Sequence, residues 1–541
     1  MLLANLVLTT SLFAAAAAPV RAPSDPPLGR PDAIVDLSTP AGAALVGATW
    51  RYHDADLVSV DGRAPGPDLK PSGRKLRTRD VLPHAEAAGF DDSRWPAIEL
   101  AASGGLPALE ERRGTGRVSF AWYRLAVTVP ARIGDVDPTG ATLAFEVVLD
   151  DYAEIWVDGR LPVVLGQPGG NVVKGFGAPN RVILGRDVRP GQTFQLAIFA
   201  MNGPISASPQ NFIWVKSATL EVYRRRASAV RDEAGVVTRL SPALDALVPR
   251  DARIEKLADG FLFTEGPVWH PDGYLLFSDP NANNIYRWTP DGALSVYRTK
   301  SGYRGLDVGL YDQPGSNGLA LDPAGRLTIN EHGNRRVTRL EKNGVLTVLA
   351  ERYDEKRLNS PNDLVYRSDG ALFFTDPPFG LPKAFDDPRK ELPHSGVYCL
   401  IDGQVKLVAR DLSGPNGLAF SPDEKFLYVD NWDVTRKVIM RYAVSPDGSL
   451  HDGAVFLDLT RVPGEQAFDG LKVDERGNVY AAGPGGLLVL SPRGEHLGTI
   501  QFSEQPANLA WGDADRRTLY VTARTGLYRV RLSVAGAGVR P

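Results

Sequence analysis

One short phrase recurs six times in the second half of the chain. Each copy has a polar residue, a short apolar strand, a turn with Asp, Gly or Pro, and a second alternating strand. The copies are Thr264–Asp279, Ser316–Glu331, Pro361–Asp376, Pro415–Asp430, Phe468–Ala482 and Ala507–Ala523. Strand-turn-strand units at a period of about 40–50 residues are typical of a β-propeller blade rather than a helical solenoid. The repeat therefore predicts an all-β fold with a six-bladed β-propeller.

The polar residue that opens each copy, called here the anchor, predicts a metal site. The anchors are Glu265, Asn317, Asn362, Asn416, Asp469 and Asn508. Equivalent positions in successive blades face one another around the central channel, so the six side-chain oxygens are expected to converge there. Buried carboxylates without partners are costly, and no Lys or Arg stands among the anchors. Oxygen-only ligation with two negative charges favours Ca²⁺, with Mg²⁺ or Mn²⁺ as alternatives and Zn²⁺ less suited.

Length and composition limit the class of protein. The chain has 541 residues, enough for two or three domains, and a formal net charge of −3. No basic tract with interleaved aromatic residues indicates nucleic-acid binding. Residues 1–22 form an apolar run that ends in small residues, which predicts a signal peptide and a periplasmic or secreted product. That run is short for a membrane span, and no other stretch is long enough.

The rest of the chain divides by its pattern of apolar residues. Residues 23–48 are rich in Pro and polar residues and are expected to form a linker. Alternating runs across 49–223 predict a β-sandwich or jelly roll. The charged segment 224–250 is expected to be a connector with solvated arginines, and 251–535 the propeller. Arg253–Phe263 is expected to supply an outer strand to the last blade, since ring closure usually joins elements from both ends.

Several phrases in 49–223 resemble the sugar-binding, galactose-binding-like jelly roll of family 2 glycoside hydrolases. They are FDDSRWP at Phe90–Pro96, AWYRLAVTVP at Ala121–Pro130, DDYAEIWVDGR at Asp150–Arg160 and the strand region Arg186–Asn202. The resemblance implies either carbohydrate binding or a structural buttress. Four aromatic residues of this region could stack on a sugar but are expected in the core instead: Trp95, Trp122, Tyr152 and Trp156.

The propeller resembles the senescence marker protein/gluconolactonase/luciferin-regenerating enzyme family. The phrases that carry this resemblance are EGPVW, SNGLALDPAGRLTINEHGNRRVTR, LNSPNDLVYRSDGALFFTDPPFGL, GPNGLAFSPD and FDGLKVDERGNVY. Members are six-bladed propellers with an axial divalent cation, commonly Ca²⁺, and several hydrolyse sugar lactones. The resemblance implies metal ligands at Glu265, Asn362, Asn416 and Asp469, with Asp469 also the general base. Asn317 and Asn508 are left as either further ligands or hydrogen-bonding residues.

Two positions bear on the substrate. Family members that act on sugar acids carry an arginine where this chain has Ser360, so that arginine is missing or is supplied by Arg304 or Arg357. His332 follows the second strand of the second repeat. It is expected either to contact substrate or relay a proton near the channel mouth, or to hydrogen-bond neighbouring loop backbone.

Three functions fit the sequence. The first is a metal-dependent hydrolase of a sugar lactone or related cyclic ester, in which the cation polarises the carbonyl and Asp469 activates water. The second is a non-catalytic, carbohydrate-binding propeller. The third is an aryl-ester or phosphotriester hydrolase with the same metal. The expected partner is a small molecule, with no nucleic acid and no membrane span.

Overall fold

The computed structural model describes most of the chain beyond its first 30 residues. The described residues are 31–64, 72–101, 106–107, 120–149, 152–161, 172–174, 179–201, 213–227, 230–233, 235–305, 307–342 and 344–538. The predicted signal peptide lies outside them. Among the described residues, no helix has the length and apolarity that crossing a membrane requires.

Two antiparallel sheets form the N-terminal part, which we call the sandwich. One sheet has the order β1 (Ala33–Asp36), β11 (Val215–Tyr223), β6 (Thr142–Leu149) and β9 (Pro179–Gly185). The other has the order β2 (Arg51–Asp54), β5 (Phe120–Thr128), β10 (Thr193–Met201), β7 (Tyr152–Val157) and β8 (Val172–Lys174). Alternate side chains of both sheets, among them Phe145, Val147, Leu196 and Ile198, share one buried core. A separate hairpin joins β3 (Asp56–Arg63) to β4 (Lys75–Leu82).

The sandwich begins earlier than the sequence predicts. Strand β1 pairs with β11, and Val35 and Leu37 enter the sandwich core, although both lie in the predicted linker 23–48. Helix α1 (Pro40–Leu45) follows, and its N-terminus is capped by the Thr39 hydroxyl, which accepts from the amide of Gly42 at 3.1 Å. The linker prediction is wrong for 33–48, because a four-residue strand between prolines leaves too short an alternation to recognise.

Six antiparallel sheets of four or five strands make up the C-terminal part. Sheet 1 contains β16 (Glu265–His270), β17 (Tyr274–Asp279), β18 (Asn284–Trp288) and β19 (Ala293–Thr299). Sheet 2 contains β20 (Ser316–Leu321), β21 (Leu327–Glu331), β22 (Arg336–Leu340) and β23 (Leu346–Ala350). Sheet 3 contains β26 (Leu364–Tyr366), β27 (Leu372–Asp376), β28 (Gly396–Ile401) and β29 (Gln404–Ala409). Sheet 4 contains β30 (Pro415–Phe420), β31 (Phe426–Asn431), β32 (Val438–Val444) and β33 (Leu450–Asp458). Sheet 5 contains β34 (Leu471–Val473), β35 (Val479–Gly483), β36 (Gly486–Leu490) and β37 (His496–Gln501). Sheet 6 contains β38 (Pro506–Gly512), β39 (Thr518–Ala523), β40 (Gly526–Arg531) and β15 (Ile254–Asp259).

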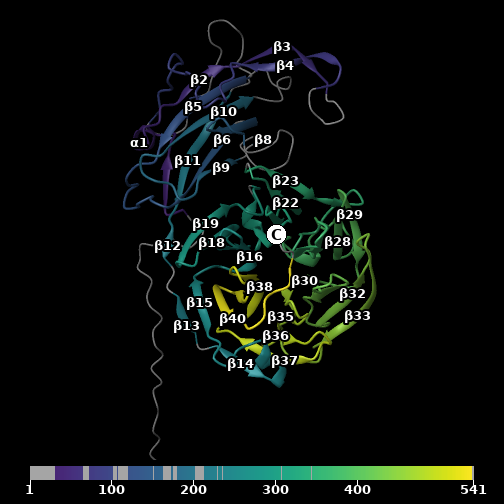
Figure 1. The fold of residues 1–541 in the computed structure, drawn as a ribbon. Helices are drawn as coiled ribbons and strands as arrows, with labels where there is room; N and C mark the ends of the chain where they lie inside the picture. Colours follow the sequence, from purple (N-terminus) through teal and green to yellow (C-terminus); the bar gives the residue numbers. More distant parts are fainter. Residues whose placement is uncertain are drawn as a thin grey trace, which may run out of the picture.

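The first strands of these sheets form a closed ring. β16 contacts β20, and contacts continue through β26, β30, β34 and β38 back to β16. Figure 1 shows the ring viewed along its central axis, with the sheets radiating from the centre. Neighbouring sheets are joined by backbone hydrogen bonds at the glycine after an anchor: Gly318 N donates to Asn362 O at 2.7 Å, and Gly417 N to Asp469 O at 3.0 Å. A Cβ at Gly417 would lie 2.5 Å from Asp469 O, so this close approach requires glycine.

The ring closes as the sequence predicts. Strand β15, from the start of this part of the chain, pairs with β40 from its end. The two ends of the ring are thereby held in one sheet, which confirms the outer-strand assignment of Arg253–Phe263.

The predicted connector is structured. Three short strands within it, β12 (Arg226–Ala227), β13 (Arg231–Glu233) and β14 (Val236–Arg239), extend the outer edges of sheets 1, 6 and 5 in turn. A 3-10 helix, η1 (Pro242–Ala246), follows. Arg224 and Arg226 reach the buried Asp32 carboxylate at 3.0 and 2.8 Å, so the prediction of solvated arginines is wrong for them. Strands of two to four residues are too short to show an alternation in sequence.

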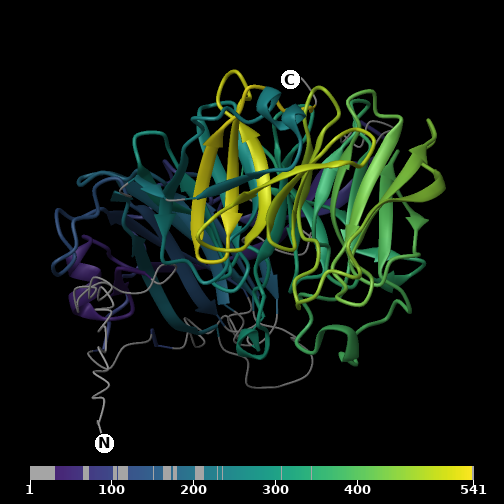
Figure 2. The ribbon, with the colours of Figure 1, turned by 90° about the horizontal axis from the view of Figure 1, so that it is seen from below.

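The sandwich docks on sheet 1, beside the ring (Figures 1 and 2). Ala144 and Tyr223 of the sandwich share a core cluster with Leu294 and Val296 of β19. The buried Arg181 donates to Thr299 Oγ1 at 2.7 Å and pairs with Glu146 and Glu221 in its own domain. Apolar contact and a satisfied buried guanidinium together make an ordered interface.

Trp95 and Trp122 are buried in a second cluster, apart from the core between the two sheets, while Tyr152 and Trp156 are only partly buried beside it. Trp95 and Trp122 are 8% and 3% exposed and pack in one cluster with Phe199. Their burial confirms the structural interpretation of these two tryptophans.

Candidate metal centre and active site

Two buried carboxyl groups meet at the centre of the ring. Glu265 opens β16, Asp469 lies two residues before β34, and their side chains hydrogen-bond to each other. Burial, followed by the nearby Asp363 charge, raises the pKa of Glu265 to about 7. Burial, followed by the charge of Glu265, raises the pKa of Asp469 well above its usual range. Both pKa shifts indicate that the protein places too little positive charge near these two carboxyl groups to balance their negative charge.

Amide side chains complete a network around these carboxyl groups. Asn362 Nδ2 donates to Asn416 Oδ1 at 2.6 Å, and Asn416 hydrogen-bonds Asp469. Asn508 Nδ2 donates to Glu265 Oε2 at 3.1 Å. Five of the six anchors are therefore linked, as the repeat predicts. Asn317 is buried at the equivalent place in sheet 2, and its Oδ1 has no hydrogen-bond partner within the described part of the chain.

His332 contacts this network directly. Its side chain is fully buried, and burial lowers its pKa to about 4. The neutral ring places Nε2 3.1 Å from Asn362 Oδ1, an acceptor, so Nε2–H is the donor. The contact with an anchor side chain goes beyond hydrogen bonding to loop backbone, and the lowered pKa does not fit a charged proton relay. The hydrogen bond instead fits a residue that orients Asn362.

Asp363 and Lys472 are axial residues that the sequence analysis missed. Asp363 occupies the position after an anchor, where four other repeats have glycine: Gly266, Gly318, Gly417 and Gly470. Its buried carboxylate lies 3.3 Å from Lys472 Nζ, which comes from β34 across the ring. Asn508 Nδ2 lies 3.4 Å from the same Asp363 oxygen. The sequence contained a signal for Asp363, because an acidic residue stands there at a position where four of the other repeats have glycine.

Asp430 adds a further buried carboxyl group. Its Oδ1 accepts from Gly417 N at 2.9 Å, while Oδ2 is buried with no partner within the described residues. Burial, followed by the charges of Asp363 and Glu265 among other causes, raises its pKa well above the usual range. Lys472 thus contributes one positive charge to a group with four carboxyls.

This donor set fits a hard divalent cation. Carboxylate and amide oxygens are the ligands such ions prefer, and a cation would supply the charge that the raised pKa values of Glu265 and Asp469 call for. Among the described residues, no three His, Cys, Asp or Glu side chains are grouped as metal ligands on their own. The candidate centre instead mixes two acids with amides.

Ser360 stands where family members that act on sugar acids carry an arginine, and its contacts show what it does in this chain. Ser360 is buried, donates to Pro377 O at 2.6 Å and accepts from Gly380 N at 2.8 Å, so it fixes a loop. Arg357 donates to Asn334 O at 2.8 Å. Arg304 lies where the charges of Arg298 and Glu331 influence it. Arg357 is therefore engaged by loop backbone rather than by an anchor.

The raised carboxyl pKa values predict how stability depends on pH without a divalent cation. Between pH 4.5, the ordinary value, and about 7, folded Glu265 keeps a proton that the unfolded chain has lost. Its contribution to stability is therefore present at low pH and lost as pH rises, by about 1.4 kcal/mol per pH unit for one proton. We expect urea unfolding in EDTA to show this loss relative to Glu265→Gln, and saturating Ca²⁺ to reverse it. An identical pH dependence in both proteins would contradict the pKa assignment.

The ring of sheets and its polar centre define a propeller-like protein with a candidate metal centre, and comparison with known proteins agrees. Residues 263–525 match the SMP-30/Gluconolactonase/LRE-like region. A gluconolactonase of Zymomonas mobilis is 36% identical over 312 residues, covering 56% of this chain and 87% of the relative. A pentonolactonase of Haloferax volcanii is 26% identical over 272 residues, covering 48% and 81%.

A solved structure extends this comparison. A gluconolactonase of Xanthomonas campestris superposes with a TM-score of 0.50 at 34% identity, covering 57% of this chain and 99% of that one. The chain belongs to the SMP-30/gluconolactonase/LRE-like family. The sandwich lies outside the residues that match the family.

Proposed function

We propose that this protein is a hydrolase of sugar lactones that uses a divalent cation at the centre of a six-bladed propeller. The observation that carries the proposal is the buried pair Glu265 and Asp469 within a ring of amides. The relatives named gluconolactonase and pentonolactonase support the reaction class. In this proposal the six sheets are the six blades, and the sandwich is a jelly roll.

Glu265, Asn362, Asn416 and Asp469 would hold the cation, with Ca²⁺ the best fit to their oxygen donors. A cation bound there supplies a Lewis acid that polarises the lactone carbonyl and stabilises negative charge as it develops on the carbonyl oxygen. Asn508 and His332 orient Glu265 and Asn362 through the contacts at 3.1 Å. Asn317, with a buried oxygen that lacks a described partner, is positioned as a further contact for substrate or ion.

Asp469 is the proposed general base. Its carboxylate accepts a proton from the attacking water, whose oxygen bonds to the carbonyl carbon. The bond from that carbon to the ring oxygen then breaks, and the ring oxygen takes the proton from Asp469 to complete the hydroxy acid. In the protein without a cation, burial and the Glu265 charge raise the pKa of Asp469. A cation beside it keeps it ionised at neutral pH.

The substrate proposed is an uncharged aldonolactone. Ser360 uses its hydroxyl on Pro377 and Gly380, so no guanidinium from that position grips a substrate carboxylate. An uncharged five- or six-membered lactone does not need one.

The direct test is a panel of hexono- and pentonolactones, an aryl acetate and a phosphotriester. Acid release is followed with a pH indicator, with Ca²⁺ and after chelation by EDTA. We expect lactone turnover with Ca²⁺ and none after chelation, restored by added cation. Thermal stabilisation by Ca²⁺ without turnover of any substrate would overturn the hydrolase proposal in favour of a binding propeller. Faster turnover of the aryl ester or phosphotriester would overturn the lactone assignment.

A further inference from the structure

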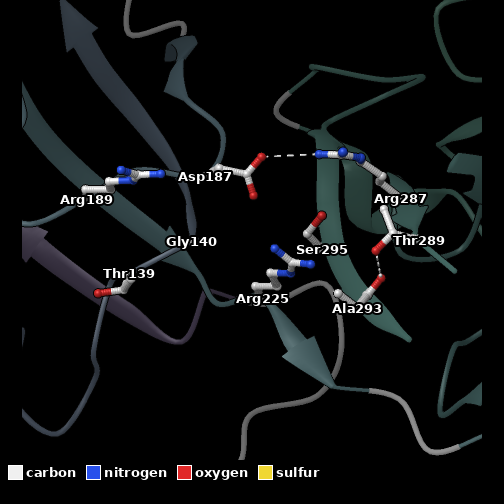
Figure 3. A pocket seen from close by; sticks show the side chains of 9 residues that line it. All are labelled: Thr139, Gly140, Asp187, Arg189, Arg225, Arg287, Thr289, Ala293 and Ser295. Carbon is white, nitrogen blue, oxygen red and sulfur yellow. Dashed lines mark hydrogen bonds and ion pairs between the residues drawn. The ribbon is translucent and has the colours of Figure 1, made fainter. Parts of the chain in front are cut away.

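A pocket of about 410 Å³ lies between the sandwich and sheet 1, on the outer side of the ring (Figure 3). Asp187 and Arg189, in the turn between β9 and β10, form one wall. Arg287 of β18 and Ser295 of β19 form the opposite wall, and Arg225 of the connector rises between them. Thr139 and Gly140 complete the lining, so the pocket draws on four segments far apart in sequence.

Positive charge exceeds negative charge in this pocket. Three guanidinium groups line it, against the one carboxylate of Asp187. Arg287 pairs with Asp187 at 3.2 Å and stacks on Tyr274, with its carbon Cζ 4.5 Å from the ring centroid. Arg225 pairs at 2.7 Å with Asp291, which lies outside the lining. Within the described part of the chain, no ion pair engages the Arg189 side chain.

Docking of the two domains does not account for all of these groups. The Arg225–Asp291 pair is largely exposed, with side chains 41% and 63% accessible, and exposed pairs contribute only about 0–1 kcal/mol. Arg189 has no ion-pair partner within the described residues and is exposed at the pocket. The interface is already held by Arg181 and an apolar core. Surplus donors that converge on a cavity are typical of an anion-binding site.

The remaining groups limit the kind of anion. The Asp187 carboxylate is an acceptor only, so it repels a compact dianion and favours a ligand with hydroxyl donors. The Ser295 hydroxyl can donate or accept. A cavity of about 410 Å³ lies within the usual range of about 300–1,000 Å³ for small-molecule sites and exceeds what one inorganic ion fills.

We propose that this interdomain pocket binds an acidic saccharide, one sugar or two in size, with its carboxylate on Arg189 and Arg225 and its hydroxyls on Asp187 and Ser295. This site is separate from the candidate metal centre and does not depend on the hydrolase proposal. It gives the sandwich a ligand-binding role that its buried tryptophans do not supply.

Isothermal titration of the full-length protein tests the proposal, with glucuronate as probe and glucose, phosphate and sulfate for comparison. EDTA is kept in the buffer so that Ca²⁺-dependent binding at the channel does not contribute. We expect glucuronate to bind most tightly and its Kd to rise at least about tenfold in Arg189→Ala. Arg493→Ala, a substitution of an exposed arginine on a distant turn, is the matched control and should leave the Kd unchanged.

Three results would overturn the proposal. They are no binding of glucuronate at 10 mM, the order of magnitude of weak carboxylate binding, an equal Kd in Arg189→Ala, and phosphate or sulfate binding as tightly as glucuronate. Arg189→Ala removes an exposed side chain, so a thermal melt equal to that of the parent protein is expected and verifies folding.

Discussion

Asp469→Asn is expected to fold like the parent protein and to lose lactonase turnover by about a thousandfold or more. The amide has the size of the carboxylate and keeps the contact with Asn416, but it removes the proposed base. General-base catalysis alone contributes about 10²–10⁴-fold, and the substitution also takes one of two charges from the proposed cation ligands. Initial rates with a pH indicator at saturating Ca²⁺ measure the loss.

Asp430→Asn is the matched control for this prediction. Asp430 is also buried, has a raised pKa and lies close enough to Glu265 and Asp363 to feel their charges. It contacts the backbone of Gly417 rather than the amides of the anchors. We expect it to retain activity within about tenfold, the scale of an indirect electrostatic change of about 1.4 kcal/mol. Turnover of Asp469→Asn close to that of this control would show that Asp469 is not the base.

Lys472→Met is expected to lower the free energy of unfolding by about 2–4 kcal/mol. The substitution leaves the Asp363 carboxylate buried without its ammonium partner, and breaking a buried pair from one side costs about 3–5 kcal/mol. We place the expected value lower because the Lys472 side chain is 23% exposed. Urea unfolding in EDTA measures the difference.

The double substitution Lys472→Met with Asp363→Asn separates charge from packing. Removing both charges should recover most of the lost stability, because no carboxylate is then left unpaired. A double variant as unstable as the single one would assign the loss to packing. We also expect tighter Ca²⁺ binding in Lys472→Met, because the substitution removes a positive charge that lies beside the carboxyl groups of the candidate metal centre.

Much of the ring could be predicted from the sequence because one phrase is repeated six times. A residue at a fixed place in a repeated unit has a fixed place in the structure, so the six anchors could be located without a template. Glu265 and Asp469, 204 positions apart in sequence (469 minus 265), were expected together and share a hydrogen bond. The closing strand β15 was predictable because closing a propeller ring usually pairs a strand from the start of the repeat region with one from its end.

Features that depend on contacts across the ring were not predictable in this way. The partnership of Asp363 with Lys472 joins sheet 3 to sheet 5, and no local pattern specifies it. The edge strands β12, β13 and β14 are two to four residues long, and their pairing is decided by the strands they meet. Strand β1 was assigned to a linker for the same reason.

The path of residues 226–239 has a consequence for how the two halves of the chain depend on each other. In leaving the sandwich, the chain supplies the outermost strand to three consecutive sheets, including sheet 6, in which the ring closes. A fragment starting at residue 251 would lack those strands and expose three unpaired strand edges, which invite intermolecular pairing. We therefore expect a fragment that starts at residue 251 to aggregate more readily than the intact chain.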